Sequence, residues 1–435
     1  MPSLLLIAPA QAEGPVVGAD APGAVPGRYI VTTEDGRTTT VRLSARDARR
    51  RAADPKVRMV EQDRRIRIAA TQRDPVWNLD RIDQRAGTPS RTYTPMDDGS
   101  AAHAYVIDTG IKISHRQFGG RASYGYDFAG DDRFADDCAG HGTHVAGILG
   151  GSTYGVAKRV KLVAVRVLDC AGEGFVSDAI DGVEWVTENA VKPAVANMSL
   201  GAAYSPSLEF AVRNSIASGV TYVVAAGNEN ADAGSVSPAG VSAAITVAAS
   251  DAEDRRAWFS NWGSTVDLFA PGVGIRSAYK GSATATAVLS GTSMASPHVA
   301  GAAALVLDAY PSYTPAQVRA YLVGRATTGR IAGRKGAPNR LLYVPAPPPA
   351  PRIATSVLPA GQVGVPYRAQ LTLVTGRRGA WSVAAGTLPD GLTLSRAGLV
   401  SGTPTTPTPT RRITVKFTDY VPQSVTRNLY VLVRG

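Results

Sequence analysis

The chain has 435 residues, 44% of them apolar, which is too long for one compact core and predicts two or three domains. Its net charge of +11 would suit a nucleic-acid partner, but the charge is unevenly spread. Residues 69–344 carry 24 basic against 25 acidic side chains, whereas residues 28–68 have a net charge of +6 and residues 345–435 one of +8. We therefore expect no nucleic acid to bind the large central region.

The N-terminal residues 1–27 predict a signal-peptide remnant followed by a flexible connector. A short apolar run at 4–7 precedes Ala10, Gln11 and Ala12, a small-residue pattern typical of signal-peptidase sites, although the usual charged leader is missing. A chance apolar tail is the alternative. Elsewhere no run of 18 apolar residues occurs, so we expect a secreted chain without a membrane span.

A small domain is expected over residues 28–69. The β-branched runs 29–33 and 38–43 predict two strands, joined by a turn at Asp35 and Gly36. Ser44 is placed to cap an Arg- and Ala-rich helix that Pro55 ends, and residues 57–60 resume strand character. The predicted order is β-β-α-β, an α+β domain.

Residues 70–344 show an α/β pattern. Apolar strands alternate with helices, and the strands are expected at 103–108, 162–168, 195–200, 220–226 and 244–249. Such alternation predicts a mostly parallel sheet covered by helices on both faces, that is, three layers. Functional residues are then expected at the carboxyl ends of the strands.

The C-terminal part begins after a proline run. Residues 345–351 predict a stiff, extended linker. Beyond it, residues 352–435 contain strand-like runs at 367–374, 413–417 and 428–433 between Gly, Pro and Asp turns, which predicts a small β-sandwich.

The chain has only two cysteines, Cys138 and Cys170. Their number is compatible with one structural disulfide outside the cytoplasm or with two unrelated buried thiols, and it does not decide between them.

Three Gly-rich segments, 106–110, 140–147 and 291–301, contain Asp108, His141 and Ser293 in that order. Serine hydrolysis needs an oxygen nucleophile, an imidazole to move its proton, and a carboxylate to hold the imidazole. Taken singly, Asp108 suits a turn and Ser293 a helix N-cap. As an ordered set they predict a catalytic triad.

A fourth residue supports acyl transfer. Asn228 ends an apolar strand and would present a side-chain amide to the oxyanion, although a lone Asn after Gly is usually a turn residue. His144 and His298 lie near the predicted triad, but no local motif supplies the third ligand of a zinc site. We therefore expect serine and not metal chemistry.

With these motifs the chain resembles the subtilase family, in its proteinase K and aqualysin branch. The resemblance covers residues 70–344 and extends to segments 75–84, 156–158, 165–170, 193–201, 259–261 and 338–343. It implies a secreted serine endopeptidase acting through an acyl-enzyme, with broad specificity and a preference for apolar or aromatic residues before the cut. A catalytically silent binding protein on the same scaffold is the alternative.

The resemblance also implies substrate-binding residues. Ser199, Leu200 and Gly201 would bind the substrate backbone as an added strand. A largely apolar pocket for the residue before the cut would be formed by Ala225, Gly227 and Thr292. Protein and peptide substrates are the expected partners, and the enzyme is expected to be a monomer.

Structural elements of the family are implied as well: a Cys138–Cys170 disulfide, and structural Ca²⁺. One calcium site would use Asp80, Asp83 and Gln84, and a second Asp267 with backbone carbonyls near Ser242 and Ala244. Solvated surface carboxylates are the alternative, and Asp131, Asp132, Asp136 and Asp137 form a further acidic cluster.

The flanking domains have resemblances of their own. Residues 28–69 resemble the family's inhibitory propeptide, which would be a partner in cis. A hairpin around Asp35 and Gly36 replaces the usual first helix. Cleavage is expected between Ala69 and Ala70. Residues 352–435 resemble immunoglobulin-like domains of bacterial surface and secreted proteins. Adhesion to anionic polymers or cell envelopes and an inert spacer are both compatible with their charge.

Overall fold

The computed structural model describes residues 13–17, 24–35, 37–64, 71–345, 351–374, 379–419 and 424–435. The chain divides into two compact units, Met1–Arg67 with Pro348–Gly435 and Ile68–Pro347. The predicted signal remnant, the predicted cleavage point at Ala69 and Ala70, Gly36 of the predicted turn, and most of the Pro-rich linker lie outside the described residues.

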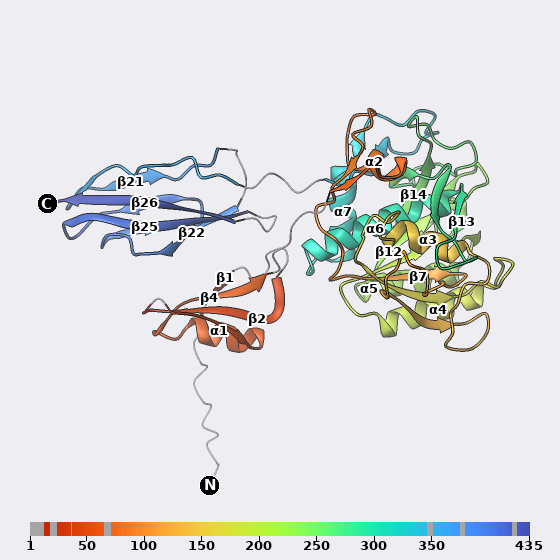
Figure 1. Cartoon of the computed structure of the whole chain (residues 1–435), viewed down its shortest axis with the longest axis horizontal. Coiled ribbons are helices and arrows are strands. Elements are labelled where there is room, and N and C mark those ends of the chain that lie inside the picture. Colours follow the sequence, from red (N-terminus) through yellow and green to blue (C-terminus); the bar gives the residue numbers. More distant parts are fainter. Residues whose placement is uncertain are drawn as a thin grey trace, which may run out of the picture. The chain divides into compact units, whose positions relative to one another are not determined.

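A nine-stranded sheet forms the centre of the second unit, in the order β18-β19-β15-β14-β12-β10-β7-β9-β8. Figure 1 labels three of its strands, β7, β12 and β14. All neighbouring strands are parallel except β18 and β19. The strands are β7 (His103–Asp108), β8 (Ala122–Asp127), β9 (Lys161–Arg166), β10 (Ala194–Met198), β12 (Thr221–Ala225), β14 (Ile245–Ser250), β15 (Leu268–Pro271), β18 (Thr327–Thr328) and β19 (Arg340–Leu341). The five predicted strands are confirmed, each within two residues at either end.

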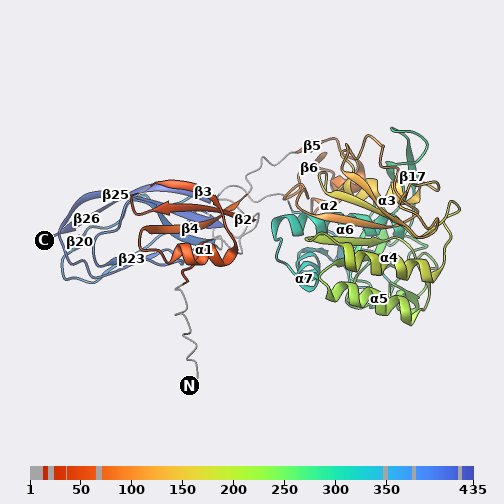
Figure 2. The same cartoon turned by 90° about the horizontal axis from the view of Figure 1, so that it is seen from below.

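Helices cover both faces of this sheet, as predicted. They are α2 (Trp77–Ile82), α3 (His141–Gly150), α4 (Val176–Asn189), α5 (Pro206–Ala217), α6 (Thr292–Ala309) and α7 (Pro315–Arg325). Along β7 the side chains alternate: Val106 packs in the core with α3 and α6, and Ile107 packs in the core with α4 and α5. Figure 2 shows α4 and α5 together on one side of the sheet.

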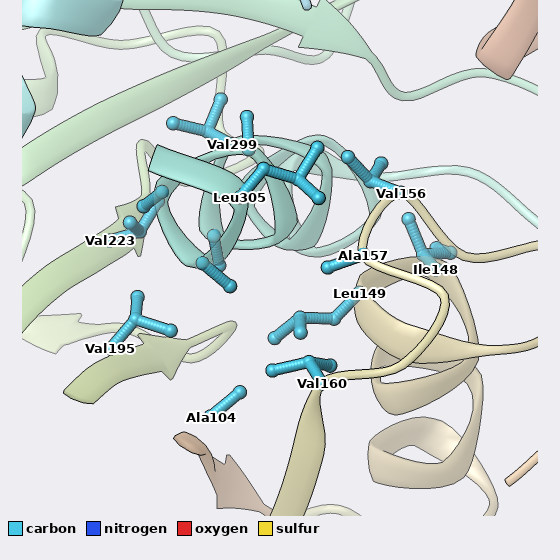
Figure 3. Packing of buried hydrophobic residues seen from close by; sticks show 14 of the residues in the cluster. Ala104, Ile148, Leu149, Val156, Ala157, Val160, Val195, Val223, Val299 and Leu305 are labelled. Carbon is cyan, nitrogen blue, oxygen red and sulfur yellow. The ribbon is translucent and has the colours of Figure 1, made fainter. Parts of the chain in front are cut away.

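Helix α6 is the central helix of one face and is buried on nearly all sides, and its residues 299–307 are all apolar or glycine. Figure 3 shows α6, with Val299 and Leu305, between Val223 of β12 on one side and Leu149 of α3 on the other. Helix α6 starts where Gly291 ends the preceding loop, and Ser293 is its second residue. The buried helix thus fixes the position of that serine.

Short strand pairs and caps complete the unit. The pairs are β5 (Gln72–Arg73) with β6 (Thr92–Tyr93), β11 (Ala202–Ala203) with β13 (Val236–Ser237), and β16 (Ile275–Ala278) with β17 (Thr286–Leu289); η1 (Ala233–Ser235) is a single 3-10 turn. Ser205 caps α5, and Thr314 forms a capping box with Gln317 on α7.

The N-terminal part has the predicted β-β-α-β order. It contains β2 (Ala24–Thr33), β3 (Thr38–Arg42), α1 (Ala45–Ala52) and β4 (Val57–Arg64), and the backbone N–H of Asp47 donates to the Ser44 Oγ, as expected of an N-cap. The segment 13–27, predicted as a flexible connector, contains regular structure in its described residues. Strand β1 (Val16–Val17) pairs in parallel with β4, and β2 already begins at Ala24.

The C-terminal part is the predicted two-sheet sandwich. One sheet has the order β20-β26-β25-β22 and the other β21-β24-β23. Their strands are β20 (Gly361–Gln362), β21 (Tyr367–Gln370), β22 (Gly379–Ala385), β23 (Leu392–Leu394), β24 (Leu399–Gly402), β25 (Thr408–Asp419) and β26 (Ser424–Arg434). Trp381 and Phe417 meet edge to face in its core, with ring centroids 5.1 Å apart.

In the part of the chain that the structure describes, we find no helix that is both long and apolar enough to cross a bilayer.

Candidate active site

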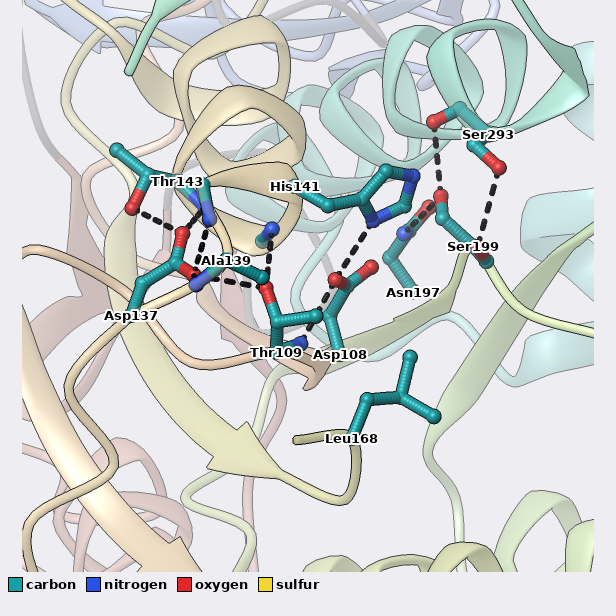
Figure 4. Close-up of polar contacts among 12 residues, drawn as sticks. Asp108, Thr109, Asp137, Ala139, His141, Thr143, Leu168, Asn197, Ser199 and Ser293 are labelled. Carbon is teal, nitrogen blue, oxygen red and sulfur yellow. Dashed lines mark hydrogen bonds and ion pairs between the residues drawn. The ribbon is translucent and has the colours of Figure 1, made fainter. Parts of the chain in front are cut away.

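Asp108 and His141 meet at the carboxyl edge of the central sheet. Asp108 is the last residue of β7 and is completely buried, and His141 is the first residue of α3. Nδ1 of His141 donates to Oδ1 of Asp108 at 2.7 Å (Figure 4). The backbone N–H of Thr109 donates to the same oxygen at 2.7 Å, which helps to fix the carboxylate. This geometry holds the imidazole in one tautomer, with Nε2 free to take a proton.

The environment raises the pKa of His141. Burial opposes the charged imidazolium, but the charge of Asp108 and its hydrogen bond outweigh that effect and lift the pKa above its usual value. The imidazole is therefore a stronger proton acceptor than a free histidine.

Asp137 organises the start of α3, a role that the sequence did not reveal. Its carboxylate accepts hydrogen bonds from the backbone N–H groups of Ala139, Gly140 and Thr143, and from the Thr143 and Thr109 hydroxyls. Because these donors occupy both carboxylate oxygens, Asp137 does not fit a cation site within the acidic cluster noted in the sequence. The carboxylate fixes both the helix that begins at His141 and the residue after Asp108.

Ser293 lies in the first turn of α6, where Figure 4 shows the ring of His141 turned toward it. Its Oγ donates to the carbonyl of Ser199 at 3.1 Å, and the Ser199 Oγ donates to the carbonyl of Ser293 at 2.9 Å. Within the described residues no hydrogen bond joins Ser293 to His141. Such bonds commonly form only when substrate is bound.

Two further polar residues, Asn197 and Ser296, hold Ser199 and α6 beside Ser293. Neither was predicted from the sequence. Asn197 donates from Nδ2 to the Ser199 Oγ at 2.9 Å, and the Ser296 Oγ donates to the Asn197 Oδ1 at 2.7 Å. All of these groups are buried or nearly so. They join β10 to α6 and so fix the serine relative to the sheet.

Asn228 is oriented by Thr292, the residue before Ser293. Its Oδ1 accepts from the backbone N–H and the hydroxyl of Thr292, at 2.9 and 3.0 Å. The Nδ2 group has no acceptor among the described residues. An amide held by its oxygen has its two N–H donors available for another group near Ser293.

The loop that carries Asn228 is held by Asn261 and Glu229. Oδ1 of Asn261 accepts from the backbone N–H groups of Glu229 and Ala231, and its Nδ2 donates to the Ala226 carbonyl and to Glu229. A Cβ on Gly227, which has a φ of +100°, would lie 2.2 Å from Nδ2 of Asn261. Only glycine fits this turn.

An open cleft of about 770 Å³ lies in front of His141. Ser199, Leu200 and Gly201 line it, together with Leu168 and Leu289. Three other residues assigned to substrate binding do not line this cleft. Thr292 and Ala225 are buried, and Gly227 donates its N–H to the Thr292 hydroxyl at 3.2 Å.

The Cys138–Cys170 disulfide is formed, which decides between the two alternatives for the cysteines. It joins the segment just before His141 to the cleft wall, since Cys170 is among the lining residues. Both cysteines are in this bond, so the chain has no free thiol.

His144 and His298 have structural roles. His144 contacts the carbonyls of Ile275 and Ala287, and His298 contacts the carbonyl of Met294 and the amide of Asn78. Burial lowers the pKa of each to about 4, so both are neutral near pH 7.

The residues of the first predicted calcium site fit a cation. Oδ1 of Asp83 is buried and has no hydrogen-bond partner, and burial together with the charge of Asp80 raises the pKa of Asp83 to about 6. A hard cation would satisfy that oxygen. The two other predicted ligand oxygens already accept hydrogen bonds from the protein. The carbonyl of Gln84 accepts one from Arg81, and Oδ1 of Asp80 accepts from the backbone N–H and the hydroxyl of Ser90.

The residues of the second predicted calcium site do not fit a cation. Asp267 is buried, with Arg319 Nη2 donating to its Oδ1 and the backbone N–H of Thr246 donating to its Oδ2. The guanidinium already supplies the positive charge. Asp267, as placed beside Arg319, therefore does not fit the calcium ion predicted for it with Ser242 and Ala244.

We predict that calcium stabilises the fold by binding Asp83. The pKa of Asp83 is about 6 in the folded state, against an ordinary 3.8. Protonated Asp83 therefore stabilises the fold below pH 4, and this stabilisation is lost as the pH rises through 6 and the carboxylate forms. At pH 8 without calcium, Asp83→Asn should thus raise the free energy of unfolding by about 1–2 kcal/mol. Calcium should raise the Tm of the parent protein but not that of this variant.

Thermal melts of both proteins in EDTA and in millimolar calcium measure these effects. Asp267→Asn is the matched control and should keep the full response to calcium. Equal calcium responses of the parent and Asp83→Asn would contradict the prediction.

Comparison with known proteins agrees with this geometry. Residues 99–342 match the family model described as "Subtilase family", and residues 350–434 match the one described as "Putative Ig domain". The chain therefore belongs to the subtilase family and is a serine proteinase of the subtilisin type, with a C-terminal immunoglobulin-like domain.

Individual relatives support the same conclusion. An extracellular serine proteinase of Thermus sp. (strain Rt41A) is 46% identical over 382 residues, 77% of this chain and 93% of that protein. Alkaline serine exoprotease A of Vibrio alginolyticus is 51% identical over 297 residues, 67% of this chain and 55% of that protein. The crystal structure of a cold adapted subtilisin-like serine proteinase superposes with a TM-score of 0.61 at 51% identity, covering 62% of this chain and 98% of that one.

Proposed function

We propose that Asp108, His141 and Ser293 are the catalytic triad of an endopeptidase that works through an acyl-enzyme. The observation that carries this assignment is the 2.7 Å bond between His141 Nδ1 and the buried Asp108, at the sheet edge beside the first turn of α6. His141 takes the proton of the Ser293 hydroxyl as its oxygen attacks the scissile carbonyl, and returns it to the leaving amine. Asp108 stabilises the imidazolium between those steps.

Asn228 is proposed to donate to the oxyanion. The supporting observation is its Thr292-bound oxygen, which leaves the amide N–H groups for a ligand. The backbone N–H of Ser293, at the start of α6, lies where helix-end donors also favour negative charge.

Asn228→Ala is expected to lower kcat by about 10²–10³-fold with little change in KM, since the donated bond forms only in the transition state. Steady-state cleavage of a chromogenic peptide measures both constants. Asn189→Ala, an exposed change at the end of α4, is the matched control and should leave kcat unchanged. A kcat for Asn228→Ala within threefold of the parent would remove Asn228 from the proposed site.

The substrate is proposed to bind as an extended strand along Ser199, Leu200 and Gly201. Main-chain pairing accepts many sequences, which supports broad specificity. Leu168, Leu200 and Leu289 in the cleft support apolar side chains in the substrate. Ala225, Gly227 and Thr292, which lie outside this cleft, stay a separate proposal for the pocket that takes the residue before the cut. Digestion of a peptide library with sequencing of the products tests this; cleavage only beside charged residues would refute the apolar preference.

Residues 28–69 are proposed to be an inhibitory propeptide that is cut between Ala69 and Ala70 during secretion. The compact β-β-α-β domain that precedes the peptidase domain supports this proposal. Mass spectrometry of the secreted protein tests it, since a mature N-terminus upstream of residue 60 would refute it.

The immunoglobulin-like domain is proposed to bind anionic polymers of the cell envelope. Its net charge, +8 over residues 345–435, supports this role. Retention of the protein on isolated cell walls, with and without residues 352–435, tests it, and equal retention would refute it.

A further inference from the structure

The substrate cleft carries an unbalanced negative charge on one wall. Among the described residues that line it, Glu173 is the one acidic side chain, and the other lining groups are apolar, glycine or neutral polar residues apart from His141. Glu173 is exposed on the cleft lining, and no ion pair to it is found in the described part of the chain. Its charge is therefore available to a ligand.

The loop that presents Glu173 is rigidly built. The backbone N–H of Glu173 donates to the Asp169 side chain at 3.0 Å, and its carbonyl accepts from the Asp169 N–H at 2.7 Å. Between them lies Cys170, bonded to Cys138. A Cβ on the following Gly174 would lie 2.4 Å from the carbonyl of Val167, so the loop is also closely packed there. These contacts fix the backbone of Glu173 on the wall of the cleft.

We propose that Glu173 is a specificity-determining residue that favours substrates with a lysine or arginine two to four residues before the cut. The inference rests on the proposed function, in which the peptide lies extended along Ser199 to Gly201. Successive side chains of an extended peptide point to opposite sides, so one of them faces the wall that carries Glu173. A flexible cationic side chain there reaches the carboxylate, while its alkyl part contacts the apolar lining.

The test compares matched peptides that differ only in lysine or norleucine at the second, third or fourth position before the cut. At low ionic strength the parent enzyme should prefer the lysine peptide at one position by about three- to fivefold in kcat/KM, the range expected of an exposed ion pair. In 1 M NaCl the ratio of kcat/KM for the lysine peptide over the norleucine peptide should fall toward one, because salt screens the attraction between Glu173 and the lysine.

Glu173→Gln should abolish the preference while retaining the activity on norleucine peptides, and Glu173→Lys should reverse it. Glu188→Gln, the same chemical change on the exposed end of α4, should leave the preference intact. A parent enzyme that cleaves every peptide with no lysine preference at any position would overturn the inference but leave the proposed triad standing. Failure to cleave any peptide would overturn both.

Discussion

Replacing Ser293 with alanine is expected to lower kcat by about five to six orders of magnitude, because the acyl-enzyme cannot form without the hydroxyl. The Oγ makes one hydrogen bond, to the carbonyl of Ser199, so the fold should survive its loss. Residual hydrolysis comes from the oxyanion donors and from binding alone. Progress curves with an activated ester substrate measure the loss over this range.

The control for Ser293→Ala is Ser207→Ala, an exposed serine of α5 for which no hydrogen bond is found among the described residues. It should retain full activity, and both variants should melt within about 2 °C of the parent. Activity of Ser293→Ala within a hundredfold of the parent would place the nucleophile elsewhere.

Asp108→Asn should lower kcat by about four orders of magnitude near pH 7, because an amide at this position favours the wrong imidazole tautomer and no longer stabilises the imidazolium. The pKa of His141, raised in the parent by the charge of Asp108, should fall. The parent should therefore lose kcat/KM as pH falls through a value above 6.5, and the variant should lose it at a lower pH.

A pH–rate profile of both proteins tests these shifts. Asp181→Asn, on the exposed face of α4, serves as the matched control and should leave the profile unchanged. An unchanged acid limb in Asp108→Asn would show that the Asp108 carboxylate does not control His141.

The parts of the site that were predictable from the sequence are those encoded by local motifs. Asp108 closes an apolar strand and Ser293 lies in the first turn of a helix, and these placements follow from short segments of sequence. Regular alternation of strands and helices then brings them to one sheet edge. The strands of the central sheet were predictable for the same reason.

The missed features depend on contacts between distant segments. Asn197 and Ser296 are 99 residues apart, and neither has a local pattern that indicates a role near the nucleophile. Asp137 stands in a run of acidic residues that suggested a cation, and only the fold reveals its five donors. Arg319 is 52 residues from Asp267, so the guanidinium that replaces the second calcium was not visible in the motif.

The N-terminal connector shows the same limit. A composition rich in Gly, Pro and Ala predicted no regular structure, but two valines of that segment pair with β4. Strand pairing with a partner more than 40 residues away overrides such local preferences.

Labelling with a fluorophosphonate, followed by peptide mapping, tests the assignment of the active site most directly. Such reagents form a stable adduct only with a serine activated by its own active site. We predict one adduct per mature chain, on Ser293, with Ser199 and Ser296 unmodified and with no labelling of Asp108→Asn at short times. An active enzyme labelled on another serine, or a folded protein that takes no label, would contradict the proposed triad.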